Sequence, residues 1–435
     1  MEKQRIKMIK LISNLKGDKG IWSFVALLAL LSFMPVFSAS SNLAYIGKGD
    51  GNTLGYLVKH IFHVGIGFTI IFMVHKVPYH YFRAIARGSL YFVWLLLGFT
   101  LFKGTVVAGA NASRWIQIPF IGVTFQPSTL ASMVLFIFVA RFLSKKRTEP
   151  LTFKLSVWEL WLPVFITLMF ILPANFSTTA LIFSMVLMLV FIGKYPLKYI
   201  GVVVGSGIVL LAFFMIIAKT FPDAFPNRVD TWISRVENFT SDKPGEDDYQ
   251  IEKAKIAIAS GKLYGLGPGK SVQKNFLPQS SSDFIYAIIV EEYGLAGGFT
   301  VIILYLLLLF RFVVASHKAK SLFGKLLVVG LGFPMVFQAM VNMAVAVELL
   351  PVTGQTLPLI SSGGSSIWMT CFALGIIISV TKKEEEIAEE KKDAAKRDEA
   401  LQKLIDRELE QEYEEVQEYA IEDKSTNPMK AVYNK

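Results

Sequence analysis

The chain has 435 residues, of which 53% are hydrophobic and only 18% are charged. A typical soluble domain carries about 25% charged residues, so this composition makes a soluble enzyme improbable and excludes a disordered or disulfide-rich secreted protein. Cys371 is the sole cysteine and lies in an apolar run, which excludes internal disulfides and cysteine-based metal sites.

Charge is unevenly distributed along the chain. Residues 382–435 contain 11 Lys and Arg against 17 Asp and Glu, a net charge of −6, whereas the other 381 residues carry 33 basic and 17 acidic groups, a net charge of +16. A basic excess often indicates nucleic-acid binding. Here the basic residues fall between apolar runs of membrane-spanning length, so we attribute them to membrane topology and expect no nucleic-acid partner.

Ten apolar runs approach or reach the roughly 20 residues that a helix needs to cross a bilayer. They predict an all-α polytopic membrane protein with about ten transmembrane helices, and we expect the shorter runs to extend into their flanks. The first run follows a basic leader, and we expect it to be retained rather than cleaved as a signal peptide. In chain order the runs are residues 21–39, 57–74, 85–102, 130–143, 157–172, 178–192, 199–218, 284–310, 326–347 and 366–380.

Lysine and arginine gather in alternate short loops, which predicts that both termini are cytoplasmic. The chain then divides into a basic N-terminus (1–20), a membrane domain (21–381) and a charged, net acidic cytoplasmic tail (382–435). One large extracytoplasmic loop, residues 219–283, lies between the seventh and eighth helices. We expect the tail to be a solvated helix, with docking to a cytoplasmic partner as the alternative.

The second half of the large loop is strongly basic. Residues 253–282 contain five lysines and no acid, and the next acid is Asp283, at the start of the eighth run. Lysines attract phosphate as point charges, and a carboxylate can accept a proton from an attacking hydroxyl. The pattern therefore suits a substrate with phosphate and hydroxyl groups. Helix capping is the alternative role for Asp283, because Asp is a preferred N-cap residue.

Glu291 and Glu292 lie eight and nine residues beyond Asp283, so one continuous helix would carry them roughly 12–13 Å into the membrane. Acids inside a membrane are functional candidates by default. We expect these two to pair with Lys, Arg or backbone groups of the bundle rather than with Asp283. Glu348, near the outer end of the ninth helix, could be structural or could line a cavity.

Three segments carry longer motifs in a fixed order. The longest spans residues 249–297 and includes Gly265-Leu266-Gly267 and Asp283-Phe284; the second comprises Asn342 and residues 350–366; the third comprises residues 112–116 and 126–128. Together, over roughly residues 15–382, they resemble the SEDS family (shape, elongation, division and sporulation), polytopic bacterial proteins that polymerise peptidoglycan. The Gln-Ser-Ser-Ser-Asp run at 279–283 and the charged tail look more like the division-type branch than the elongation-type branch.

The resemblance implies a membrane glycosyltransferase that polymerises lipid II, a disaccharide-peptide on undecaprenyl pyrophosphate, for septal cell-wall synthesis. The catalytic aspartate of the family falls on Asp283, which would act as general base in an inverting glycosyl transfer. Further residues would contact the substrate or offset the pyrophosphate charge: Lys270, Lys274, Arg114, Gln273 and Ser282.

The resemblance also implies a divalent cation, Mg²⁺ or Mn²⁺, at a site that the sequence does not locate, and no organic cofactor. The expected partners are lipid II, undecaprenyl pyrophosphate-linked glycan, a class B penicillin-binding protein as transpeptidase, and other division proteins. The expected location is the bacterial inner membrane at the septum. The alternatives are a lipid II flippase, an elongation-type polymerase and a membrane scaffold for division proteins.

The chain departs from the family pattern at several positions. Gln279 replaces a glutamate, Asn175 an aspartate and Ser362 a tyrosine, while Thr129 and Ser132 stand where the family has a Glu and Lys pair. These departures bear on secondary sites and not on the main assignment.

Overall fold

The computed structural model describes residues 15–46, 53–104, 115–117, 124–145, 152–220, 246–277, 279–382, 386, 392 and 395–411. It divides into two compact units, Met1–Thr381 and Lys382–Lys435. The described part of the first unit contains one sheet, a short antiparallel ribbon. In this ribbon Ile116 of β1 (Ile116–Gln117) pairs with Phe125 of β2 (Thr124–Phe125).

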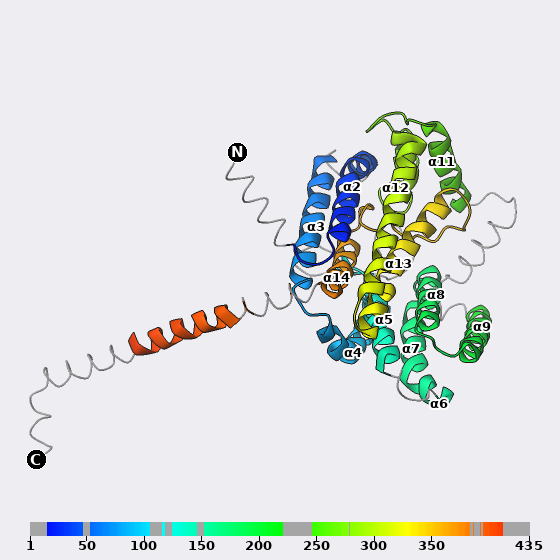
Figure 1. The fold of residues 1–435 in the computed structure, drawn as a ribbon. Coiled ribbons are helices and arrows are strands. Elements are labelled where there is room, and N and C mark those ends of the chain that lie inside the picture. The colour runs from blue at the N-terminus through cyan, green and yellow to red at the C-terminus, as the bar shows by residue number, and fades with distance from the viewer. Residues whose placement is uncertain are drawn as a thin grey trace, which may run out of the picture. The chain divides into compact units, whose positions relative to one another are not determined.

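The ten predicted runs are all helical (Figure 1). Among the described residues, eight helical segments are long and apolar enough to cross a membrane, and α8 and α14 are shorter apolar helices. The prediction of an all-α polytopic membrane protein is therefore confirmed. The helices are α2 Lys19–Ile46, α3 Thr53–Val74, α4 His80–Lys103, α5 Pro127–Lys145, α6 Phe153–Ser156, the π-helical turn η2 Val157–Trp161, α7 Leu162–Ile171, α8 Phe176–Ile192, α9 Leu197–Thr220, α11 Glu246–Gly261, η4 Gln273–Asn275, α12 Ile285–Lys318, α13 Leu322–Ala346 and α14 Gly364–Val380.

Burial differs sharply between helices. Helix α13 is the most enclosed of the long apolar helices and α9 the least, and α9 lies at the edge of the bundle in Figure 1. Val209, Phe213 and Ile216 of α9 are all exposed. Lipid tails are as apolar as these side chains, so such a surface suits contact with a bilayer.

The two ends of the bundle carry different contacts. At one end, Asp18 forms an ion pair with Arg311 of α12 and its N–H donates to Thr381 Oγ1 at 2.9 Å, while Tyr79 bonds to Ser321 at 3.0 Å. We call this the Asp18 end. The opposite end, the loop end, carries residues 262–277, 279–283 and 348–363. The sequence prediction that the Asp18 end faces the cytoplasm stays a prediction.

The eighth predicted run, residues 284–310, is not one regular helix. Gly294 has φ 69° and ψ −173°, so α12 breaks there into residues 285–293 and 295–318. Glu292 precedes Arg311 by 19 residues, about 28 Å of helix, which is nearly the full hydrocarbon thickness of about 30 Å. Glu291 and Glu292 lie in the first part of α12, just before the break. Their expected depth of roughly 12–13 Å in the membrane stays a prediction.

The second unit contributes one described helix, residues 395–411, whose side chains are exposed. Lys403 and Glu399, one turn apart, form an ion pair at 2.8 Å. Such exposed i,i+4 pairs add about 0.3–0.5 kcal/mol to a helix.

Candidate active site

The loop that follows α11 folds back across the break in α12. Four backbone hydrogen bonds join the two segments: Leu266 N–H to Glu291 O (2.9 Å), Gly267 N–H to Glu292 O (2.9 Å), Leu295 N–H to Lys262 O (2.9 Å) and Ala296 N–H to Leu263 O (3.3 Å). The backbone groups left unpaired by the break in the helix are thus satisfied by the loop, as buried backbone groups must be.

Two glycines make this crossing possible. Gly265 and Gly294 both have positive φ (80° and 69°). A Cβ on Gly265 would lie 2.2 Å from Glu292 O, and one on Gly294 would lie 2.2 Å from Leu263 O. Both the backbone conformation and the close approach of the two chains therefore require glycine.

Glu291 and Glu292 hold the same loop through their side chains. Each is 1% exposed. Glu291 accepts hydrogen bonds from Val272 N–H (3.0 Å), Gln273 N–H (3.2 Å) and the Ser271 hydroxyl. Glu292 accepts from Ser271 N–H at 3.3 Å and from the Ser38 hydroxyl of α2. The predicted pairing of these acids with backbone groups is confirmed, although the partners belong to the loop.

Asp283 lies two residues before Ile285, the first residue of α12, and is partly exposed. Its N–H donates to Gln279 O at 3.1 Å, and its carbonyl accepts from Asn342 Nδ2 of α13 at 2.6 Å. The N-cap position of α12 falls on Phe284, so the capping alternative for Asp283 is not supported. Hydrogen bonds of its N–H and its carbonyl thus fix the backbone of Asp283, and a general base must be held in position.

A second loop, residues 348–363, closes over the Asp283 segment. A Cβ on Gly354, which has φ 66°, would lie 3.5 Å from Asp283 Oδ2. Further contacts join the loop to its surroundings: Asn342 Nδ2 to Gln355 O (2.7 Å), Gln355 Nε2 to Thr178 Oγ1 of α8 (2.9 Å), Ser361 Oγ to Ser282 O (2.6 Å) and Ser362 N–H to Ser281 O (2.9 Å). The structure thus brings the two long sequence motifs together at Asp283.

Backbone strain gathers in the same two loops. Gln279, Glu348 and Leu359 have φ values of 62°, 61° and 67°, a region that residues with side chains rarely adopt. Such conformations persist where the surrounding contacts fix them, and they cluster at functional sites.

The predicted substrate-binding residues have different environments. Lys270 is exposed at the tip of its loop. Lys274 is partly buried and donates to Ser38 Oγ (3.1 Å) and Gly269 O (2.8 Å). Gln273 contributes its N–H to the Glu291 carboxylate, so Gln273 and Lys274 help to build the loop.

Two predicted residues remain, Ser282 and Arg114. Ser282 is adjacent to Asp283, and its hydroxyl donates to Gln279 Oε1 at 2.6 Å. Arg114 lies outside the described residues. The sequence did not indicate that Ser38 belongs to the site, because Ser38-Ala39-Ser40 resembles a signal-peptide cleavage site. All three residues are buried. Ser38 contacts Glu292 and Lys274.

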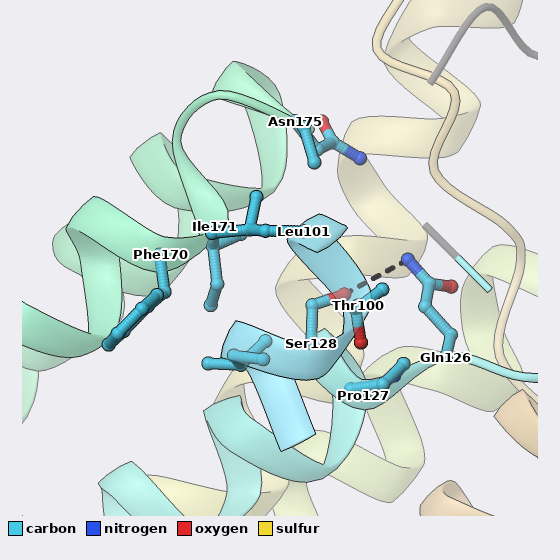
Figure 2. Close-up of a pocket in the computed structure, with 10 residues that line it drawn as sticks. Thr100, Leu101, Gln126, Pro127, Ser128, Phe170, Ile171 and Asn175 are labelled. Carbon is cyan, nitrogen blue, oxygen red and sulfur yellow. Dashed lines mark hydrogen bonds between the residues drawn. The ribbon is translucent and has the colours of Figure 1, made fainter. Parts of the chain in front are cut away.

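A pocket lies between the last turns of α4 and α7 and the first turn of α5 (Figure 2). Gln126 and Ser128, from the shorter motif, line it together with Asn175 and Thr100. Gln126 Nε2 donates to Ser128 Oγ at 3.0 Å. Asn175 Oδ1 caps α8 by accepting from Thr178 N–H at 3.1 Å. Thr178 Oγ1 in turn accepts from Gln355 Nε2, so hydrogen bonds through Thr178 link Asn175 to the 348–363 loop.

Thr129 and Ser132, which depart from the family pattern after Gln126, form hydrogen bonds with nearby backbone carbonyls. Where the family resemblance leads one to expect a charged pair, the Thr129 hydroxyl donates to Gln126 O (2.6 Å) and the Ser132 hydroxyl to Thr129 O (2.8 Å). These hydroxyls satisfy backbone carbonyls in the first turns of α5 and need no ionic partner.

The described residues provide no obvious set of ligands for the divalent cation that the family resemblance implies. Within the described ranges, no group of three or more His, Cys, Asp and Glu side chains could hold a metal ion. The residues described here thus do not fit a cation site formed by protein side chains alone, and the mechanism proposed below uses only the groups of the chain.

The fold and the site define a multi-pass membrane protein in which two loops at one end of a helical bundle enclose an aspartate. A family model described as "Cell cycle protein" (FtsW, RodA and SpoVE) matches residues 18–386. The chain belongs to this family.

Two curated relatives are both called "Probable peptidoglycan glycosyltransferase FtsW". The protein of Nitrosomonas europaea is 31% identical over 368 residues, covering 82% of this chain and 91% of the relative. That of Hydrogenovibrio crunogenus is 32% identical over 365 residues, covering 82% and 90%.

Two solved structures share the fold. One comes from work titled "Structural coordination of polymerization and crosslinking by a peptidoglycan synthase complex", with a TM-score of 0.63, 22% identity and coverage of 84% of this chain and 97% of the other. The second is the rod shape determining protein RodA of Thermus thermophilus, with a TM-score of 0.60, 23% identity and coverage of 85% and 98%.

Proposed function

We propose that this chain is a peptidoglycan glycosyltransferase that polymerises lipid II into glycan strands during cell division. The observation that carries the proposal is the position of Asp283, a partly exposed carboxylate whose backbone is fixed where the two long motifs meet. Relatives about 30% identical over most of the chain bear the name of this activity and of the division-type branch.

In the proposed reaction Asp283 accepts the proton of the acceptor sugar hydroxyl. The hydroxyl oxygen attacks the anomeric carbon of the growing strand, the bond from that carbon to the lipid pyrophosphate breaks, and the pyrophosphate leaves with the bonding electrons. The configuration at the carbon inverts because attack and departure occur on opposite faces. General base catalysis of this kind contributes about 10²–10⁴-fold in rate.

The surrounding residues position the base and attract the substrate. Asn342 joins the Asp283 segment to the 348–363 loop by donating to both, which restricts the carboxylate to a narrow range of positions. Lys270, exposed at its loop tip, would attract the phosphates of the incoming lipid. The exposed apolar helix faces would contact the lipid chains.

We further propose a class B penicillin-binding protein as the partner transpeptidase, at the septum of the bacterial inner membrane. The likeness in fold to a chain from a peptidoglycan synthase complex supports this partner class. Penicillin-binding transpeptidases combine a Ser-x-x-Lys motif with Lys-Thr-Gly, and the sequence contains no Lys-Thr-Gly, so we expect a second protein to crosslink the product.

The test is polymerisation of lipid II by the purified full chain, with and without the partner transpeptidase. We expect glycan strands from the native chain and none above background from Asp283→Asn. Asp398→Asn, the same substitution in the exposed tail helix, is the matched control and should retain activity. Robust strand synthesis by Asp283→Asn would contradict the assignment of the base.

The same preparation separates the alternatives. Transbilayer movement of labelled lipid II without polymer would indicate a flippase. Loss of cell division on deletion of residues 383–435, with polymerisation intact, would indicate a scaffolding role of the tail that is separate from catalysis.

A further inference from the structure

Helix α14 begins at the loop end without a side-chain cap. Its N-cap residue, Gly363, offers no side chain, whereas α8, the other short apolar helix, is capped by Asn175. The first N–H groups of any helix lack intrahelical partners and carry a partial positive charge. Both features attract an anion, although an uncapped helix end alone does not make a site.

Buried polar groups without partners surround this helix end. His63 of α3 is 5% exposed, and its Nδ1 has no hydrogen-bond partner. A Cβ on Gly364 would lie 3.1 Å from His63 Cε1 and Nε2, so the imidazole lies directly against the first residue of α14. Ser365 Oγ and Trp368 Nε1 are also buried and unpartnered, and the Trp368 ring centroid is 5.2 Å from that of His63.

A lysine adds charge to the same place. Lys59 precedes His63 by one helical turn on α3 and is exposed. Residues four apart share one face of a helix, so Lys59 lies on the loop-end side of the imidazole. Helices α3 and α14 pack side by side along their lengths (Figure 1).

The depth of this cluster matches that of a lipid headgroup. Helix α14 has 17 residues, about 25 Å of helix, and its last turn lies at the Asp18 end, where Thr381 contacts Asp18. The hydrocarbon core is about 30 Å thick, so the first turn of α14 lies near the opposite boundary.

The cluster also adjoins the proposed base. Ser361 and Ser362, just before α14, bond to the carbonyls of Ser282 and Ser281, so one short segment connects the two sites. An anion bound at the start of α14 would thus be held close to the carboxylate that activates the acceptor.

We propose that the N-terminus of α14, with His63, Lys59 and Trp368, binds the pyrophosphate group of a polyprenyl-linked lipid. Backbone N–H groups, the imidazole and the indole N–H would donate to the phosphate oxygens, and Lys59 would offset their charge. The identity of the lipid rests on the proposed function. The site differs from the lysines of the 262–277 loop, because it lies on the membrane helices themselves.

The test compares two probes that share a lipid chain and differ in the anion, undecaprenyl pyrophosphate and undecaprenol. The dissociation constant of each probe is measured with the full-length protein in nanodiscs. The ratio of the two constants removes the contribution of the lipid tail that the probes share. We expect a strong preference of the native protein for the pyrophosphate. His63→Phe and Lys59→Met should each reduce this preference, by about tenfold for His63→Phe, because a hydrogen bond to a charged group is lost.

His80→Phe is the matched control, since His80 is exposed at the start of α4, near the Asp18 end, and the ratio should not change. If His63→Phe fails to fold, Lys59→Met carries the test because its side chain is exposed. An unchanged ratio in Lys59→Met and in folded His63→Phe would overturn the proposal.

Polymerisation of lipid II by the same native preparation separates this inference from the proposed function. Strand synthesis with an unchanged ratio in the variants would refute the pyrophosphate site alone. Absence of strands, with a ratio that falls in both variants, would refute the proposed function and still support the site.

Discussion

Three carboxylates within ten residues differ in what they contact. Glu291 and Glu292 are fully buried, and their oxygens accept hydrogen bonds from backbone N–H groups and serine hydroxyls. Asp283 is partly exposed, and the contacts that fix it involve its backbone. The first two acids build the loop, whereas the third can meet a substrate. Burial, more than proximity in sequence, therefore separates these two structural acids from the candidate base.

The largest expected effect is on activity and comes from Asp283→Asn. The amide cannot accept the proton of the acceptor hydroxyl, so the rate of lipid II polymerisation should fall by about 10²–10⁴-fold. The unfolding temperature should stay within about 2 °C of the native value, because the contacts of the Asp283 backbone are retained. A large drop in that temperature would place Asp283 with the structural acids.

Gly265→Ala should destabilise the protein most. A Cβ there would lie 2.2 Å from Glu292 O, and positive φ costs a residue with a side chain about 1–2 kcal/mol. We expect the loop to detach from α12, which limited proteolysis within residues 262–277 would report. Gly269→Ala is the matched control: Gly269 has φ 78° but open space around it, so it should show the conformational cost alone.

Glu291→Gln should lower stability less than Gly265→Ala and still reduce activity. One of its two accepting oxygens becomes a donor, which leaves a buried N–H or hydroxyl unpaired at a cost of about 1–3 kcal/mol. Thermal unfolding in detergent would measure the loss. Glu348→Gln is the control, because Glu348 pairs with Lys255 at 2.5 Å with both side chains about half exposed, and such pairs contribute about 0–1 kcal/mol.

The smallest effects should separate the two lysines of the loop. Lys270→Met removes an exposed charge, so the apparent affinity for lipid II should weaken by about two- to fivefold with unchanged stability. Lys274→Met removes donors to Ser38 and Gly269 and should lower the unfolding temperature. The reverse pattern would show that Lys274 is the substrate contact.

The membrane helices were predictable because spanning length and apolar composition are local properties of the sequence. All ten runs are helical, and the three that looked short reach 17–19 residues in α5, α8 and α14. The break in the run at 284–310 was not predicted, because the apolar composition continues through Gly294, where the backbone leaves helical geometry.

The family motif in the sequence identified Asp283 as the candidate base, whereas the residue pattern by itself left helix capping open as its role. Tertiary structure decided the rest. Glu291 and Glu292 became loop anchors because the chain folds back across Gly294, and Asn342 reached Asp283 from 59 residues away. His63 lies against the start of α14 because α3 and α14 pack along their lengths. Such long-range contacts depend on how helices pack, which a local pattern in the sequence does not specify.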